Sequence, residues 1–180
     1  MMTPLASALQ RWLFVVLAVA AAGLCPAATP EEKLAALGIQ LPPVPAAIAN
    51  YVPAVRSGNL VFLAGQIAKG PDGQFLAGKV GQDLTVEQGA AAARTCAIQL
   101  LAALKAEIGD LAKVRRIVRV GGFVNCPPGF TAQPKVINGA SDLLVAVFGD
   151  RGRHARAAVG VAALPAGAPV EVELVAEIAE

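Results

Sequence analysis

The feature that most constrains the fold of this chain is the stretch from Thr85 to Ile108, in which apolar residues recur every three or four positions. That spacing places them on one face of a long helix. Thr85 and Gln88 form a capping-box pattern at its start, and Gly109 is typical of a helix end. A helix with one apolar face needs a second layer to cover that face. The expected apolar face consists of Val86, Ala90, Ala93, Ala97, Leu100, Leu101, Leu104 and Ile108.

Extended segments and a second helix surround this element. Residues 59–67 (NLVFLAGQI) are typical of a buried strand, and the RSGN turn before them predicts a hairpin with residues 52–56 (VPAVR). Residues 113–126 alternate apolar and basic side chains, which favours an edge or interface strand. Residues 133–149 predict a second helix, because apolar residues recur at helical spacing until Gly149 ends the pattern.

Two further strands close the chain. Residues 155–164 and 169–178 both favour extended structure, and the PAGA segment between them predicts a short hairpin. The order of elements is hairpin, helix, strand, helix, hairpin, which indicates an α+β two-layer domain: a mixed sheet with both helices on one face. The other face of the sheet then needs a cover, so we expect a homo-oligomer.

The N-terminus has the order of a secretory signal. Arg11 precedes an unbroken apolar run from Trp12 to Leu24, and small residues follow. We expect residues 1–27 to be a signal peptide, residues 28–50 an extended lead-in and residues 51–180 the folded domain. The alternative is a retained membrane anchor, but the run is shorter than the roughly 20 apolar residues of a spanning helix. We therefore expect export to the periplasm, without stable membrane insertion once the signal is removed.

Charge and cysteine content limit the partners and cofactors. The net charge is +2, with no basic tail and almost no aromatic residue beside a basic one, so we expect no nucleic-acid partner. Cys96 and Cys126 would remain after signal removal, and their spacing leaves open whether they form a disulfide. No Cys-x-x-Cys pair or Cys/His cluster points to a metal, and we expect no cofactor.

Alternation along the last predicted hairpin indicates a small charged pocket around Arg156. An arginine on a rigid strand is suited to hold a carboxylate. The alternative is a structural ion pair between Arg156 and Glu171 at an oligomer interface. His154 lies between arginines without a predictable acid or serine partner, so we interpret it as a solvent-exposed loop residue. The side of Arg156 is expected to hold Ala158, Gly160, Ala162, Glu171 and Glu173, and the core side Val159, Val161, Val170, Val172 and Leu174.

Three segments resemble the Rid/YjgF family, also called the L-PSP endoribonuclease family. They are ANYVPAVRSGNLVFLAGQI (49–67), GDLAKVRRIVRVGGFVN (109–125) and above all HARAAVGVAALPAGAPVEVELVAEI (154–178). The likeness extends over about residues 36–179. It implies a chorismate-mutase-like fold and a homotrimer with its ligand pocket at the subunit interface.

The resemblance also implies roles for particular residues. Arg156 corresponds to the arginine that holds the substrate carboxylate by a two-pronged contact, and Glu171 to a glutamate that handles a water. The serine that family members place before Gly-Gln is Ala64 here, and Ser141 replaces an aromatic residue one helical turn beyond the family's asparagine. The substrate-binding positions are Tyr51, Asn138, Ala64 and Arg156.

Three functions follow from this resemblance. Active members hydrolyse reactive enamines and imines of 2-amino acids, giving a 2-keto acid and ammonia without a cofactor. The alternative is a binding protein that holds a small carboxylate-bearing molecule in the same pocket without turnover. Endoribonuclease activity, which the older family name implies, has less support because the chain lacks a basic and aromatic surface.

Overall fold

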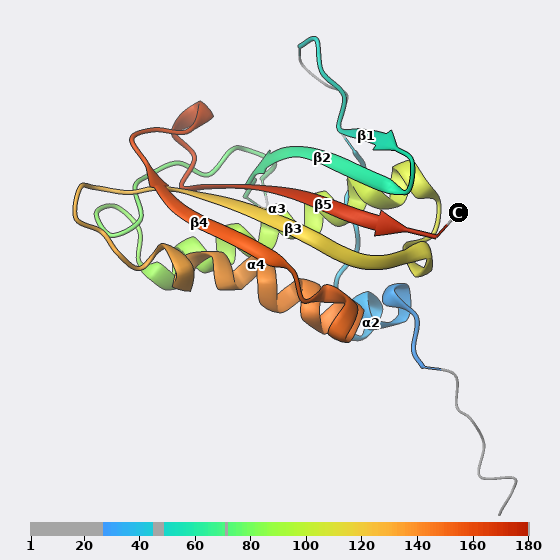
Figure 1. Ribbon diagram of the computed structural model, residues 1–180. Coiled ribbons are helices and arrows are strands. Elements are labelled where there is room, and N and C mark those ends of the chain that lie inside the picture. Colours follow the sequence, from blue (N-terminus) through green and yellow to red (C-terminus); the bar gives the residue numbers. More distant parts are fainter. Residues whose placement is uncertain (1–26, 45–48, 71, 180) are drawn as a thin grey trace, which may run out of the picture.

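The computed structural model describes residues 27–44, 49–70 and 72–179 (Figure 1). Apart from Ala27, the expected signal peptide lies outside these residues. Within the described ranges, no helix combines the length and the apolar character needed to cross a membrane. The elements are α2 (Pro30–Ala36), β1 (Ala54–Ser57), β2 (Leu60–Ile67), α3 (Val86–Ile108), η1 (Leu111–Lys113), β3 (Val114–Asn125), α4 (Gln133–Phe148), η2 (Gly149–Gly152), β4 (Ala155–Val161), η3 (Pro165–Gly167) and β5 (Val170–Ile178).

The strands form one mixed sheet in the order β1-β2-β5-β3-β4, and α3 and α4 both lie on one face of it (Figure 1). All neighbours are antiparallel except β3 and β4, which are parallel. The predicted hairpin of β1 and β2 is confirmed, with Ser57 paired to Leu60 across a turn where Gly58 has φ of 60°. The expected two-layer α+β arrangement is also confirmed.

The predicted hairpin of the last two strands is wrong. β5 lies between β2 and β3, whereas β4 pairs only with β3 and forms an edge of the sheet. Residues along β5 alternate between buried and half-buried, as a central strand next to a helical layer requires. β4 is mostly exposed and rich in small residues, which suits an edge. The segment between the two strands therefore carries the chain past β3 instead of folding back directly.

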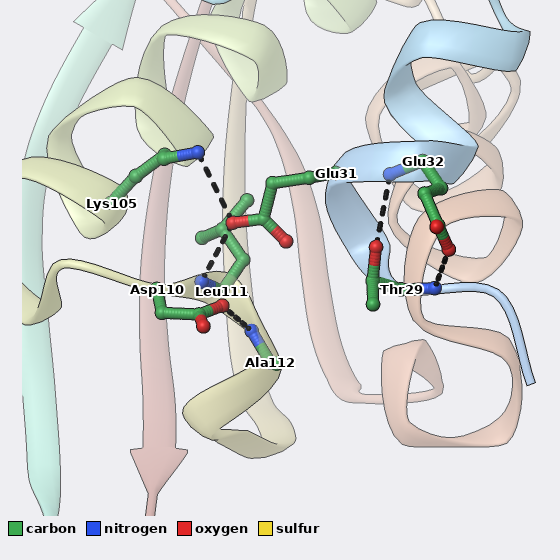
Figure 2. Close-up of polar contacts among 7 residues, drawn as sticks. All are labelled: Thr29, Glu31, Glu32, Lys105, Asp110, Leu111 and Ala112. Carbon is green, nitrogen blue, oxygen red and sulfur yellow. Dashed lines mark hydrogen bonds and ion pairs between the residues drawn. The ribbon is translucent and has the colours of Figure 1, made fainter. Parts of the chain in front are cut away.

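The lead-in also differs from the expectation, because residues 30–36 form α2 and are not extended. Thr29 and Glu32 make a reciprocal capping box at its start, and Leu34 is buried in the core. The Glu31 carboxylate accepts a hydrogen bond from the Leu111 backbone N–H at 3.0 Å and pairs with Lys105 at 3.2 Å (Figure 2). These contacts fasten α2 to the end of α3 and to η1.

The core lies between the two helices and the sheet. Its α3 side includes most of the predicted apolar face, with Ala93, Ala97, Leu100 and Leu104 fully buried. The two helices pack closely at Gly139 of α4, where an added Cβ would clash with a carbonyl oxygen of α3. Cys96 and Cys126 are both buried and free, so they form no disulfide in this structure.

The face of the sheet opposite the helices is not covered by any element that the structure describes. It exposes 52% of Val55, 45% of Phe62 and 45% of Val159. Val55 of β1 and Phe62 of β2 are paired with each other across the hairpin, and Val159 of β4 is paired with Phe123 of β3. We call this surface the open face.

Candidate functional site

Arg156 lies on the helix side of the sheet, which reverses the expectation for β4. Arg156 is in register with buried Val120, and partners in a parallel ladder share a face. Ala158 packs against the core, whereas Val159 is exposed on the open face. Alternation fixes which residues share a side but not which side meets the helices. Space on this side of β4 is tight, since a Cβ on Gly160 would lie 2.8 Å from the sulfur of Cys126.

Glu171 lies on the opposite face from Arg156 within one chain. The expectation for β5 is confirmed, because Val170, Val172 and Leu174 are buried in the core and the glutamates point the other way. The predicted pocket on a single hairpin, with Arg156 and Glu171 side by side, is therefore wrong. The five candidate site residues instead fall into two groups.

The first group surrounds the Arg156 guanidinium, where β4 meets α4. Nη1 of Arg156 donates to Oδ1 of Asn138 at 2.9 Å and to Oγ of Ser141 at 3.0 Å. Asn138 and Ser141 lie one turn apart on α4, so both reach the same nitrogen. Neither Nε nor Nη2 of Arg156 donates to any residue within the described ranges. The arginine is exposed, so this part of the guanidinium faces solvent.

His154 belongs to the same group, although sequence reasoning excluded it. Its Nε2 lies 3.1 Å from Oγ of Ser141, and its Nδ1 lies 2.6 Å from the carbonyl oxygen of Gly152. The side chain is half-buried, and burial lowers its pKa, with the charge of Arg156 acting in the same direction. The interpretation as a solvent-exposed residue without a serine partner is wrong. The contact depends on how α4 packs on β4, which no local sequence pattern specifies.

The second group lies around Glu171, at a cavity of about 870 Å³. Tyr51, Ala64 and Glu171 all line it, and Arg156 and Asn138 do not. An irregularity in the pairing of β2 with β5 between Leu63 and Gln66 brings the backbone of residue 65 against Glu171. A Cβ on Gly65 would clash with the Glu171 carboxylate, so a side chain at position 65 would displace that carboxylate from its position here.

The Glu171 carboxyl has an environment suited to proton transfer. Burial raises its pKa, and the neighbouring negative charge of Glu173 raises it further. Glu173 itself pairs with Arg119 at 3.6 Å, so the nearby arginine is engaged by the other glutamate. A carboxyl with a raised pKa next to a cavity can exchange a proton with a bound water or ligand. Within the described ranges, no group of three acidic, histidine or cysteine side chains is arranged to hold a metal ion.

Comparison with known proteins defines the class. Protein Atu1372 of Agrobacterium tumefaciens, whose crystal structure is described as of unknown function, superposes with a TM-score of 0.78 at 45% identity, covering 84% of this chain and 94% of the other. RidA of the Antarctic bacterium Psychrobacter sp. PAMC 21119 has a TM-score of 0.53 at 29% identity, covering 75% and 94%. The expected chorismate-mutase-like α+β fold is confirmed.

Sequence comparison then gives the family. Residues 31–178 match the family described as "YjgF/chorismate mutase-like, putative endoribonuclease". Protein TCP17 of Trypanosoma cruzi is 49% identical over 147 residues, which cover 81% of this chain and 92% of the relative. The chain belongs to the YjgF family. The match begins within α2, so the helical part of the lead-in lies inside the family's domain.

Proposed function

We propose that this protein is a hydrolytic deaminase of reactive enamine and imine derivatives of 2-amino acids, which it converts to a 2-keto acid and ammonia. The reaction class is that of active Rid proteins, which the sequence resembles, and the chain belongs to the YjgF family. The observation that carries the proposal is the exposed guanidinium of Arg156, which is fixed through Nη1 and keeps other N–H groups available. A carboxylate of the substrate is the ligand that such a group prefers.

The site is completed between subunits of a homotrimer. In one chain Arg156 and Glu171 lie on opposite faces of the sheet, so they cannot act on one small substrate. The open face carries exposed Val55, Phe62 and Val159, a surface of the kind that self-association covers. A second copy packed against this face can supply the arginine that the Glu171 side lacks. The number of three subunits comes from the family resemblance.

The chemistry needs positioning and one proton relay. Charge-assisted bonds from Arg156 to the carboxylate contribute about 1.5–3 kcal/mol each and hold the imine carbon in place. Glu171 takes a proton from water as the water oxygen bonds to that carbon, and it passes this proton to the imine nitrogen, which gives a carbinolamine. Glu171 then moves the hydroxyl proton of the carbinolamine to the amino group, the C–N bond breaks as the carbonyl forms, and ammonia and the 2-keto acid are released. Tyr51 and Ala64 line the cavity beside Glu171.

The test is an assay on purified protein with 2-iminopropanoate and 2-iminobutanoate generated in situ. The wild type is expected to accelerate keto-acid release, and Arg156→Ala to lose about tenfold or more, the equivalent of one charge-assisted bond. Arg153→Ala is the matched control, because Arg153 is exposed and, among the residues that the structure describes, pairs only with Asp150 at 3.2 Å. A wild-type rate equal to the uncatalysed rate would overturn the deaminase proposal.

A non-catalytic carboxylate-binding protein is the second candidate. It is favoured by Ala64, which lines the cavity without the hydroxyl that the resemblance places there. Such a protein would show no turnover, yet pyruvate would raise the thermal unfolding temperature of the wild type and not of Arg156→Ala. Keto-acid release faster than the uncatalysed rate would show that the protein is an enzyme and not only a binding protein.

We also propose that the chain is exported and that residues 1–27 are removed as a signal peptide. Periplasmic protein is then expected to have the mass of a chain that begins at Ala28. Leu17→Arg, which breaks the apolar run, is expected to keep the full-length chain in the cytoplasm. Wild-type protein that keeps residues 1–27 in the cytoplasmic fraction would contradict export.

A further inference from the structure

A chain of hydrogen bonds connects the backbone after α4 to the guanidinium of Arg156. The carbonyl oxygen of Gly152 lies 2.6 Å from Nδ1 of His154, and Nε2 of the same ring lies 3.1 Å from Oγ of Ser141. That oxygen accepts from Nη1 of Arg156 at 3.0 Å. The carbonyl can only accept, so Nδ1 carries the proton of the neutral ring and Nε2 is an acceptor.

This tautomer determines the direction of the Ser141 hydroxyl. Since Nε2 accepts, the Ser141 hydrogen points to His154 and the oxygen lone pairs are free to face Arg156. One hydrogen of Nη1 goes to Ser141 and the other to Asn138, so Nη1 has no donor left. The donors that remain are those of Nε and Nη2. Their N–H bonds are parallel and match the two oxygens of a carboxylate.

The neutral state of His154 fits its surroundings. Burial and the charge of Arg156 both hold its pKa below the ordinary value of 6.5. A protonated Nε2 would direct a second positively charged donor at the Ser141 oxygen, which already accepts from the Arg156 guanidinium. The charged groups around His154 are Asp150 and Arg151 of η2, Arg153 directly after η2, Lys135 and Asp142 of α4, Arg115, Arg116 and Arg119 of β3, and Arg156 of β4.

We infer that His154 and Ser141 are positioning residues that occupy Nη1 of Arg156, so that a ligand carboxylate is held by the Nε and Nη2 edge of the guanidinium. The inference rests on the proposed function, because it specifies how the same arginine binds its ligand. Without the acceptor on residue 154, the Ser141 hydroxyl can rotate and Arg156 loses one of its two anchors.

The binding test measures the dissociation constant of pyruvate at pH 7.5 for four variants. Ser141→Ala and His154→Leu are each expected to raise it about three- to tenfold, the effect of one lost hydrogen bond. The double variant is expected to bind no more weakly than either single variant, because both remove the same contact. His154→Gln keeps an acceptor near the position of Nε2 and is expected to stay within about twofold of the wild type.

Wild-type binding by both single variants, or multiplied effects in the double variant, would overturn the inference. The inference would also be overturned if His154→Gln binds pyruvate as weakly as His154→Leu. That result would show that the shape of the histidine ring matters and that its hydrogen-bond acceptor does not. Arg153→Ala is the control for a general loss of positive charge near the site, and we expect it to leave the dissociation constant unchanged.

Nitrogen NMR tests the inference even if the wild type binds no carboxylate and the proposed function fails. The chain has one histidine, so its imidazole signals need no assignment. We expect the Nδ1-protonated tautomer at pH 7.5 and a shift of the Nε2 signal in Ser141→Ala. An Nε2-protonated ring, or an Nε2 signal that does not change in Ser141→Ala, would contradict the positioning role.

Discussion

Two candidate site residues are held by contacts that come from distant parts of the chain. The Arg156 guanidinium is directed to α4 by its hydrogen bonds to Asn138 and Ser141. The Glu171 carboxylate occupies the space that a Cβ on residue 65 would take. Sequence reasoning identified Arg156 as the residue of interest but chose the wrong face, since an alternating pattern of small residues fits both faces equally well.

The shifted pKa values of His154 and Glu171 predict opposite dependences of stability on pH. The pKa of His154 is lowered, so the unfolded chain binds its proton first and the free energy of unfolding falls as the pH drops below the ordinary histidine value of 6.5. In His154→Gln this loss between about pH 7 and 5 is expected to be smaller. Denaturant unfolding at a series of pH values measures it, and identical pH slopes in the two proteins would contradict the lowered pKa.

The titration of Glu171 changes the free energy of unfolding with pH in the opposite direction. Its pKa is raised by burial and by Glu173, so the native state binds the proton more tightly and stability falls as the pH rises above the ordinary carboxyl value of 4.5. Glu171→Gln is therefore expected to stabilise the chain at neutral pH and to lose this advantage below about pH 4. Glu173→Gln is the companion variant, because it removes the repelling charge without touching the Glu171 side chain. If Glu171→Gln is less stable than the wild type at pH 7, the fold stabilises the charged form of Glu171 and the raised pKa is contradicted.

The elements were predictable where local patterns decide them. The capping box of Thr85 and Gln88 and the apolar spacing after it specify α3, and the turn at Gly58 specifies the β1–β2 hairpin. The neighbours of β4 and β5 were not predictable, because a hairpin and a crossover past β3 can use the same short connection. The helix at Pro30–Ala36 had a readable signal in Thr29 and Glu32, but the prolines that follow favoured an extended segment.

At the contact between α3 and α4, a glycine-to-alanine substitution is expected to lower stability, the opposite of its usual effect in a helix. In an exposed helix, Gly→Ala stabilises by up to about 1 kcal/mol. At Gly139 the new Cβ would clash with the Ala90 carbonyl, so Gly139→Ala is expected to destabilise by about 1–3 kcal/mol. Thermal and denaturant unfolding measure the sign. Stabilisation would show that the helices can separate at no cost.

Two contacts of Glu31 attach α2 to the rest of the chain, and their contributions to the free energy of unfolding can be measured separately. Glu31→Gln removes the ion pair with Lys105 but keeps an acceptor for the Leu111 N–H, so it is expected to cost less than about 1 kcal/mol. Glu31→Ala removes both and leaves an N–H without its partner, at about 1–3 kcal/mol. Equal losses in the two variants would assign the whole effect to the ion pair.

At the scale of the whole molecule, the candidate site residues of one chain lie in two separate groups, and we propose that each group is half of a site. Arg156 with Asn138 lies where β4 meets α4, whereas Glu171 with Tyr51 lines the cavity, which Gln99, Ala102 and Ala103 of α3 also border. The family resemblance identified these residues, but the sequence could not show that they separate, because pairing between copies leaves no local pattern. The exposed apolar residues of the open face indicate where a second copy would pack.

Complementation between two inactive variants tests this claim most directly. Arg156→Ala and Glu171→Gln are purified, unfolded together in equal amounts and refolded, and deaminase activity is measured against each variant refolded alone. Sites shared between the copies of a trimer predict recovery of about a quarter of the wild-type activity, since each mixed trimer regains one intact site. Activity no higher than that of the separate variants, with mixed trimers confirmed by mass, would contradict a site built from two chains.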